Sequence, residues 1–233
     1  YDSGPHKNHA AIGNNQNLPI KSTISVVGGS YEFPKNQNRD FQTNTFNGVM
    51  KLDNFALSGW IRGTVNDAQD WHDYYGIETT NGGQLRFEAN NGNPPRIHVP
   101  ASGIVHPNLY STNDTAGKLD NGEWNHLVFT GTGGKLNLYM NGVLNTSNNF
   151  QEGAQVGGFV IAQANNNSAG AIHDEVGLHK IARHERWVNA THQSQIPGNS
   201  FVNYGTLAGP PYFEDTVSEL YGKKNVTISP FTP

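Results

Sequence analysis

The chain contains no cysteine, and this absence removes several kinds of chemistry at once. Without cysteine there are no disulfide bonds, no thiolate ligands for zinc and no cysteine nucleophile. Stability must therefore come from a packed core, and the 233 residues are enough to bury one. The length predicts one large domain, or one domain with a short appendage.

Charge is also scarce, since only 15% of the residues are charged and the formal net charge is −4. Such a surface offers no basic stripe for the phosphates of a nucleic acid and no polybasic segment for a membrane. No apolar run approaches the roughly 18 residues that span a bilayer. We therefore expect neither a nucleic-acid partner nor insertion into a membrane.

Asparagine and glycine, in contrast to cysteine and charged residues, are abundant, with about thirty asparagines and 27 glycines. Some of the asparagines form glycosylation sequons, at Asn113, Asn145, Asn166, Asn189 and Asn225. This surface chemistry predicts an extracellular or cell-surface protein. The alternative is that an asparagine-rich chain produces sequons by chance.

Short apolar runs separated by turn residues dominate the chain, as in an antiparallel β-sandwich. The clearest pattern runs over residues 124–144, where apolar residues alternate on both arms of a hairpin. Both faces of this hairpin are partly apolar, so we expect it inside a sheet that is covered on both sides. Trp124, Leu127, Phe129 and Leu138 are predicted to be buried. Only residues 180–195 look helical.

Four separated motifs resemble one known family. The hairpin "NGEWNHLVFTGTGGKLNLYMNGVL" and the stretch "DEVGLHKIARHERWVNATHQSQ" are similar to the closing part of laminin-G-like, concanavalin A-like domains of secreted bacterial or archaeal surface proteins. "YDSGPHKNHAAIG" and "NSFVNYG" resemble their start and coda. The resemblance implies an all-β, two-sheet antiparallel jelly-roll sandwich over residues 1–205, with one short helix. It leaves the function open, because this fold carries lectins, adhesion domains, glucanases and lyases.

The resemblance also implies a calcium site. In the family the aspartate that matches Asp174 is often held against the N-terminal Asp-Ser turn, frequently with calcium. Here Asp2, Asn8 and Asp174 would supply oxygens to a shell of about six to eight ligands. The alternative is that Asp174 caps backbone amides without an ion. His173, Glu175 and His179 are predicted to share one strand face, where a transition metal is a weaker possibility.

Enzymatic activity is not expected from the motifs. A glucanase of this fold would show Glu-x-Asp-x-x-Glu along one strand, and this spacing is absent from the sequence. "RFEA" and "RIHV" are fragments of a lyase pattern without its order. No Gly-x-Ser-x-Gly elbow or phosphate loop is present. A polysaccharide lyase or glycoside hydrolase is therefore the third hypothesis.

The stretch "NDAQDWHDYYGIE" is the best candidate for ligand binding. Aromatic rings stack on the apolar faces of sugars, while carboxylates accept hydrogen bonds from sugar hydroxyls. If these residues bind glycan, the aromatic ones must be exposed in the free protein; packing would bury them instead. The predicted ligand-binding residues are Asp70, Trp71, His72, Asp73, Tyr74 and Tyr75.

Residues 206–233 form a linker and a predicted tail strand that either packs on the domain, begins another domain or joins a neighbouring copy by strand addition. Two main hypotheses follow. The first is a non-catalytic carbohydrate-binding or adhesion module with a glycan or cell-surface partner. The second is a structural subunit of an extracellular filament or surface layer, which self-associates through the tail.

Overall fold

The computed structural model of the chain describes residues 11–12, 19–34, 41–43, 50–63, 72–90, 93–98, 109–110, 119, 122–162 and 170–196. The chain divides into two compact units, Tyr1–Asn199 and Ser200–Pro233. All described residues belong to the first unit. The predicted tail at 206–233, like the predicted residues Asp2, Asn8, Asp70 and Trp71, lies outside the described residues.

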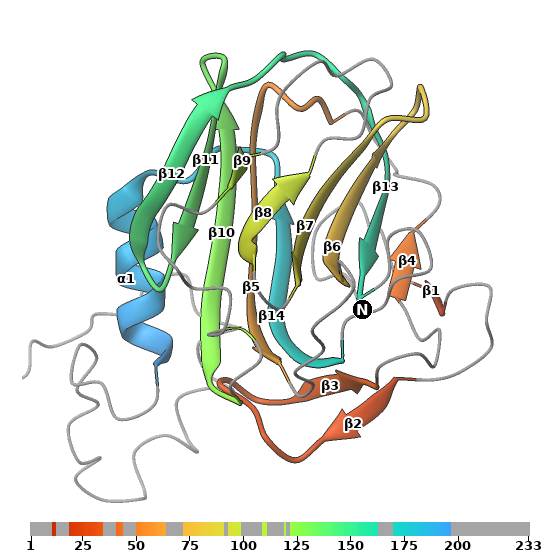
Figure 1. Cartoon of the computed structure of the whole chain (residues 1–233), viewed down its shortest axis with the longest axis vertical. Helices are drawn as coiled ribbons and strands as arrows, with labels where there is room; N and C mark the ends of the chain where they lie inside the picture. The colour runs from red at the N-terminus through yellow and green to blue at the C-terminus, as the bar shows by residue number, and fades with distance from the viewer. Residues whose placement is uncertain are drawn as a thin grey trace, which may run out of the picture. The chain divides into compact units, whose positions relative to one another are not determined.

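The first unit contains two antiparallel sheets of seven strands each, which confirms the predicted all-β sandwich (Figure 1). Sheet A has the order β1 (Ala11–Ile12), β4 (Phe41–Thr43), β13 (Val156–Ile161), β6 (His72–Thr79), β7 (Gln84–Asn90), β8 (Asn93–His98) and β9 (Leu109–Tyr110). Sheet B has the order β12 (Val143–Asn149), β11 (Lys135–Met140), β10 (Trp124–Thr132), β5 (Asn54–Gly63), β14 (Ala171–His179), β3 (Ser30–Phe33) and β2 (Ile20–Ser22).

The turn between β11 and β12 carries residues that tolerate a positive φ. Asn141 and Gly142 have φ values of 50° and 82° in the tight turn between β11 and β12. This pair of left-handed residues is typical of a two-residue hairpin turn that matches the twist of the strands. Gly142 also lies close to the helix, since a Cβ there would approach His192 Cβ to 3.2 Å.

The core lies between the two sheets and is filled by side chains that alternate along the strands. On β10, Leu127 and Phe129 face the core, and their register partners on β11 are Met140 and Leu138. All four are buried, as the alternation predicts. Trp124 departs from the prediction, because this first residue of β10 is only half-buried.

Helix α1 (Glu185–Gln195) covers the outer face of sheet B and is the only helix in the described part of the chain. Figure 1 shows it beside β12 and β11. Val188 of the helix packs on Val128 and Tyr139, which form a second, smaller apolar cluster. The helix therefore explains why both faces of the central hairpin are apolar, as the sequence predicts.

An aromatic stack fixes the C-terminal end of α1 to sheet B. The ring of His192 stacks on Trp60 with 5.5 Å between centroids, and His126 lies 4.9 Å from the same indole. The Trp60 indole N–H donates to Gln195 Oε1 at 2.7 Å. The indole N–H of Trp60 therefore has an acceptor, which a buried tryptophan requires.

Three of the described histidines are buried, His126, His173 and His192, and burial lowers the pKa of each. His173 lies between the sheets among the rings of Tyr74 and Tyr75, and neither of its ring nitrogens has a hydrogen-bond partner. Burial lowers the pKa of His173 to about 3. Burial and the nearby His192 lower the pKa of His126 to about 3. Protonation at acidic pH therefore favours the unfolded chain, where histidine has a pKa of about 6.5.

Replacing Phe129 with alanine should lower the free energy of unfolding by about 3–5 kcal/mol, because it leaves a cavity in the core. Urea denaturation measures this loss. Val143→Ala is the matched control, since Val143 is 64% exposed on β12, and it should change stability by less than about 0.5 kcal/mol. Equal losses in the two variants would contradict the placement of Phe129.

The buried histidines predict a loss of stability in acid. As the pH falls from about 6.5 towards 3, each should remove up to about 1.4 kcal/mol per pH unit, because the unfolded chain binds the proton and the folded chain does not. His173→Phe cannot be protonated, so it should lose less stability than the wild type between pH 7 and pH 4.5 in denaturant titrations. Val143→Ala changes an exposed side chain that cannot be protonated and should keep the wild-type slope. A wild-type slope in His173→Phe would overturn this explanation.

Candidate functional site

The prediction that Tyr74 and Tyr75 are exposed for ligand binding is wrong. Tyr74 and Tyr75 are 2% and 0% exposed and belong to the core. The strand register shifts between Asp73 and Tyr75, which indicates a β-bulge at this point of β6. A bulge lets two successive residues face the same side of a sheet, so both tyrosines point inwards. His72 begins β6 with its backbone paired to Ala89.

Asp73 is the predicted residue that the structure places in a polar site. It faces away from the core and joins four other side chains on neighbouring strands, which we call the charged cluster. The cluster consists of Asp73 on β6, Arg86 and Glu88 on β7, and Arg96 and His98 on β8. Their neighbours in sequence, such as Phe87 and Ile97, point into the core.

The register of the three strands assembles the charged cluster. Asp73 lies opposite Glu88, and Glu88 lies opposite Arg96 on its other side. Arg86 lies opposite His98, one step further along the sheet. Directly opposed residues have Cβ atoms about 4.5–5.5 Å apart, so their side chains interact. The described members of the cluster thus all lie on strands.

Glu88 is the centre of the charged cluster and is 2% exposed. Its Oε1 atom accepts from Arg96 Nε at 2.5 Å and lies 2.7 Å from His98 Nδ1. A carboxylate only accepts, so this shorter contact favours the proton on His98 Nδ1 and the lone pair on Nε2, although Arg96 Nη2 also lies 3.2 Å from Nδ1. Burial lowers the pKa of His98, and the Glu88 carboxylate opposes that change. The Glu88 charge is therefore matched by Arg96.

Burial favours the protonated form of Asp73. Burial, followed by a hydrogen bond with Glu88, raises the pKa of Asp73 to about 8. Its Oδ2 atom lies 3.4 Å from Arg86 Nη1, while Oδ1 has no N–H or O–H donor. Oδ1 is thus the oxygen that is free to carry the proton, which the two opposed carboxyl groups share.

The sequence contained a signal for this cluster, in "RFE" and "RIH". Both have charged or polar residues at alternate positions around an apolar one, which places Arg86 with Glu88, and Arg96 with His98, on one face of a strand. Their proximity depends on the strand register, which the sequence does not specify. In the sequence alone they therefore resemble only fragments of a lyase pattern.

Asp174 serves as an acceptor for backbone amides. Its Oδ2 atom accepts from the amides of Val26 and Val27 at 2.7 Å and 2.9 Å, and Oδ1 accepts from Glu175 at 2.9 Å. These bonds tie β14 to the loop between β2 and β3. They match the ion-free alternative for Asp174. Calcium at Asp2, Asn8 and Asp174 stays a prediction, because its other two ligands lie outside the described residues.

The prediction that His173, Glu175 and His179 share one face is wrong. Glu175 has a φ of 48°, and the register of β14 shifts between Asp174 and Gly177. This irregularity breaks the alternation, so His173 points into the core while Glu175 is exposed. His179 contacts Ser58 Oγ at 3.1 Å. Among the described residues no group of three or more acidic or histidine side chains is arranged to hold a metal ion.

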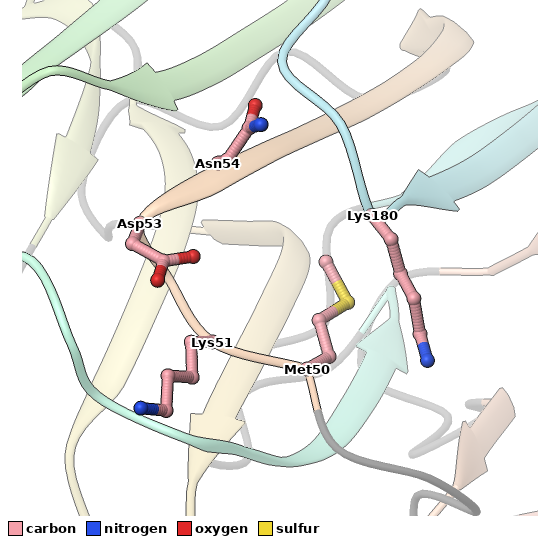
Figure 2. A pocket seen from close by; sticks show the side chains of 5 residues that line it. All are labelled: Met50, Lys51, Asp53, Asn54 and Lys180. Carbon is pink, nitrogen blue, oxygen red and sulfur yellow. The ribbon is translucent and has the colours of Figure 1, made fainter.

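A shallow depression of about 470 Å³ lies near the start of β5, and it is a weaker candidate. It is lined by Met50, Lys51, Asp53, Asn54 and Lys180. Figure 2 shows the amino groups of the two lysines at separate ends of long side chains, without a common point of convergence. The charged cluster, in contrast, concentrates buried and interacting groups, so it is the better candidate site.

The shared proton predicts that Asp73→Asn stabilises the protein at neutral pH. The pKa of Asp73 is raised on folding, so its contribution to stability is complete below about pH 4 and is lost as the pH rises towards 8. Asparagine keeps the donor to Glu88 and needs no proton from solvent. The gain in denaturation midpoint over wild type should therefore grow from pH 4 to pH 8. Asp53→Asn, at an exposed carboxyl, should show no such growth, and a constant difference for Asp73→Asn would contradict the shared proton.

Solved structures of similar fold include toxin binding domains and a pentraxin. The binding domain of Paraclostridial Mosquitocidal Protein 1 superposes with a TM-score of 0.61 at 14% identity, covering 80% of this chain and 47% of that one. The binding domain of Botulinum Neurotoxin DC in complex with SialylT gives 0.60 at 12% identity, covering 81% and 47%. This chain thus spans about half the length of these toxin domains. The SAP-like pentraxin from Limulus polyphemus gives 0.56 at 11% identity, covering 79% and 91%.

At these identities the structural matches show the fold alone. No curated protein matches the chain in sequence. The laminin G family model of the concanavalin A-like lectin/glucanases superfamily matches residues 35–189, which is more than half of the chain. The chain therefore belongs to this family.

Proposed function

We propose that this domain is a non-catalytic carbohydrate-binding or adhesion module that binds its glycan on the outer face of sheet A, over the charged cluster. The observation that carries the proposal is the cluster itself. Strands β6, β7 and β8 hold five polar or charged side chains on one face. The sandwich fold itself does not require charged residues there. Buried charged groups are uncommon unless they are paired or functional.

The chemistry of the charged cluster suits a sugar. Arginine donors, a carboxylate acceptor and the free Nε2 atom of His98 supply both kinds of hydrogen-bonding group that hydroxyls need. Rigid strands hold these groups in place, so little conformational entropy is lost on binding. His98 and Arg96 have the more exposed side chains, at 26% and 11%. We therefore assign the first contact with ligand to them.

The arrangement supports binding better than hydrolysis. A glycoside hydrolase needs two carboxyl groups on either side of the scissile bond, with separate roles. Asp73 and Glu88 are directly opposed across two strands and share a proton, and Glu88 is held by Arg96 and His98. The two carboxyl groups therefore do not lie on either side of a space for a scissile glycosidic bond.

The family match and the glycan-bound toxin neighbour support this reading. An extracellular location is part of the proposal: the sequon residue Asn189 is exposed on α1 and is open to a glycosyltransferase. Among the described residues, the helix falls short of the length and apolarity that a membrane-spanning helix needs.

A structural subunit is the second candidate. Four large apolar side chains are exposed on or next to the edge strand β2 of sheet B: Ile20, Ile24, Val27 and Tyr31. An edge strand with exposed apolar residues is a site where another chain can add a strand. The charged cluster lies on the other sheet, so the two candidates are separable by experiment.

A glycan array with the full chain tests the proposed function. Arg96→Gln and His98→Ala should each weaken binding by about 1–3 kcal/mol, because each removes a hydrogen-bonding group from the face. Arg186→Gln is the matched control, since this exposed arginine lies on α1, on the opposite side of the sandwich. A chain that binds no glycan, but whose mass in sedimentation rises with concentration, would support the structural subunit and contradict the binding module.

A further inference from the structure

Helix α1 meets sheet B through histidines. Three of them lie where the helix contacts the strands: His126 on β10, His179 at the end of β14 and His192 on the helix itself. His126 and His192 both pack on the Trp60 indole, and their own ring centroids are 5.9 Å apart. The ring of His179 meets the Trp187 ring of the helix edge-on at 5.6 Å. We call these three histidines the histidine interface.

The histidine interface has no acceptor for an added proton. Nδ1 of His126 and Nδ1 of His192 are buried and have no hydrogen-bond partner. A histidinium carries a proton on both ring nitrogens, so each would bury an N–H without an acceptor. Nδ1 of His179 lies 3.2 Å from Arg183 Nη2, and because an arginine only donates, this nitrogen must accept. Protonation of any of the three is therefore costly while the helix is docked.

The charged groups around the interface do not compensate a histidinium, and no carboxylate among the described residues contacts these three histidines. Asp174 on β14 lies opposite Trp60, but its two oxygens already accept from backbone amides. Of the partly buried cations, Arg62 on β5 donates to a backbone carbonyl and Arg183 stacks on Trp187 at 4.6 Å. The other charged side chains on or beside these elements are exposed: Glu123, Lys135, Glu175, Lys180, Glu185 and Arg186.

The apolar attachment of α1 is separate from the main core. Val188 packs with Val128 and Tyr139 in the small cluster outside the sandwich, whereas the main cluster fills the space between the sheets. Burial and the nearby Glu185 raise the pKa of Tyr139, so its hydroxyl stays neutral in acid. Backbone pairing of β5 with β10 and β14 holds the centre of sheet B without the helix. The helix can therefore leave the sheet while the core stays closed.

We propose that α1 is an acid-sensitive cover, which separates from sheet B when the histidine interface takes up protons while the sandwich stays folded. Separation brings all three rings into water, where each N–H finds an acceptor. It also uncovers an apolar face on sheet B that includes Trp60, Val128 and Tyr139. The charged cluster lies on sheet A, so this inference is independent of the proposed glycan site.

The direction of the pH effect follows from the two states of each histidine. In the docked state, burial and His192 lower the pKa of His126 to about 3, and burial and Arg183 lower the pKa of His179 to about 4. Burial also lowers the pKa of His192. In the released state each histidine has its ordinary pKa of about 6.5. Below that pH the released state binds more protons, so each histidine raises the released fraction by up to about tenfold per pH unit.

Hydrogen exchange of the full chain, followed by mass spectrometry from pH 7 to pH 4.5 and corrected for the intrinsic amide rate, tests the proposal. Peptides from α1 should lose at least about tenfold in protection per pH unit and become nearly unprotected in acid. Peptides from β7 in the main core should stay protected at the same pH. Equal protection of α1 and β7 at every pH would mean that the helix opens only when the whole chain unfolds, which overturns the proposal.

Three variants assign the effect to the histidine interface. His126→Phe and His192→Phe keep an aromatic ring that cannot be protonated, so each should reduce the loss of α1 protection by up to about tenfold per pH unit. His173→Phe is the matched control, because His173 is a buried histidine of the main core and should leave the pH dependence of α1 unchanged.

Thermal melts at pH 7 show which of these variants are folded. If His126→Phe does not fold, the comparison of His192→Phe with His173→Phe decides. A wild-type pH dependence of α1 in folded His126→Phe and His192→Phe overturns the proposal, and so does a wild-type helix whose protection does not change with pH.

Discussion

Side chains along a strand alternate between its two faces, and on β7 this constraint joins the core to the charged cluster. Leu85, Phe87 and Ala89 are buried between the sheets, and the residues between them, Arg86 and Glu88, are held on the other side. Each core contact therefore also fixes the position of a charged group. A shift of the register by one residue would expose the core and bury the charges at the same time.

The two arginines of the charged cluster contact its two carboxyl groups unequally. Opposed carboxyl groups at Asp73 and Glu88 share one proton, so the sheet carries less negative charge than its sequence indicates. Among the described residues, Arg96 contacts Glu88 closely, whereas Arg86 has one contact of 3.4 Å with Asp73. A buried arginine with an unpartnered Nε atom costs the folded protein stability. Stability and recognition therefore draw on the same residues.

The sequence predicts those parts of this fold that depend on local patterns. Alternation and the Asn141-Gly142 turn specify the hairpin from β10 to β12, including the apolar face that the helix covers. Bulges are different, because one extra residue reverses every face that follows it. The bulge of β6 turned Tyr74 and Tyr75 inwards, and the positive φ of Glu175 separated His173 from Glu175 on β14. The charged cluster needed the register of three strands, which distant contacts set.

The position of β14 has a consequence for synthesis of the protein. This strand is the last of sheet B in the chain, yet it lies between β5 and β3, and it holds residues 26 and 27 through Asp174. Until residue 179 has left the ribosome, β5 and β3 have no strand between them, and their edges are open to other chains. A nascent polypeptide that lacks β14 therefore carries these two edges unpaired. A chaperone that shields such edges is best placed to act before this strand emerges.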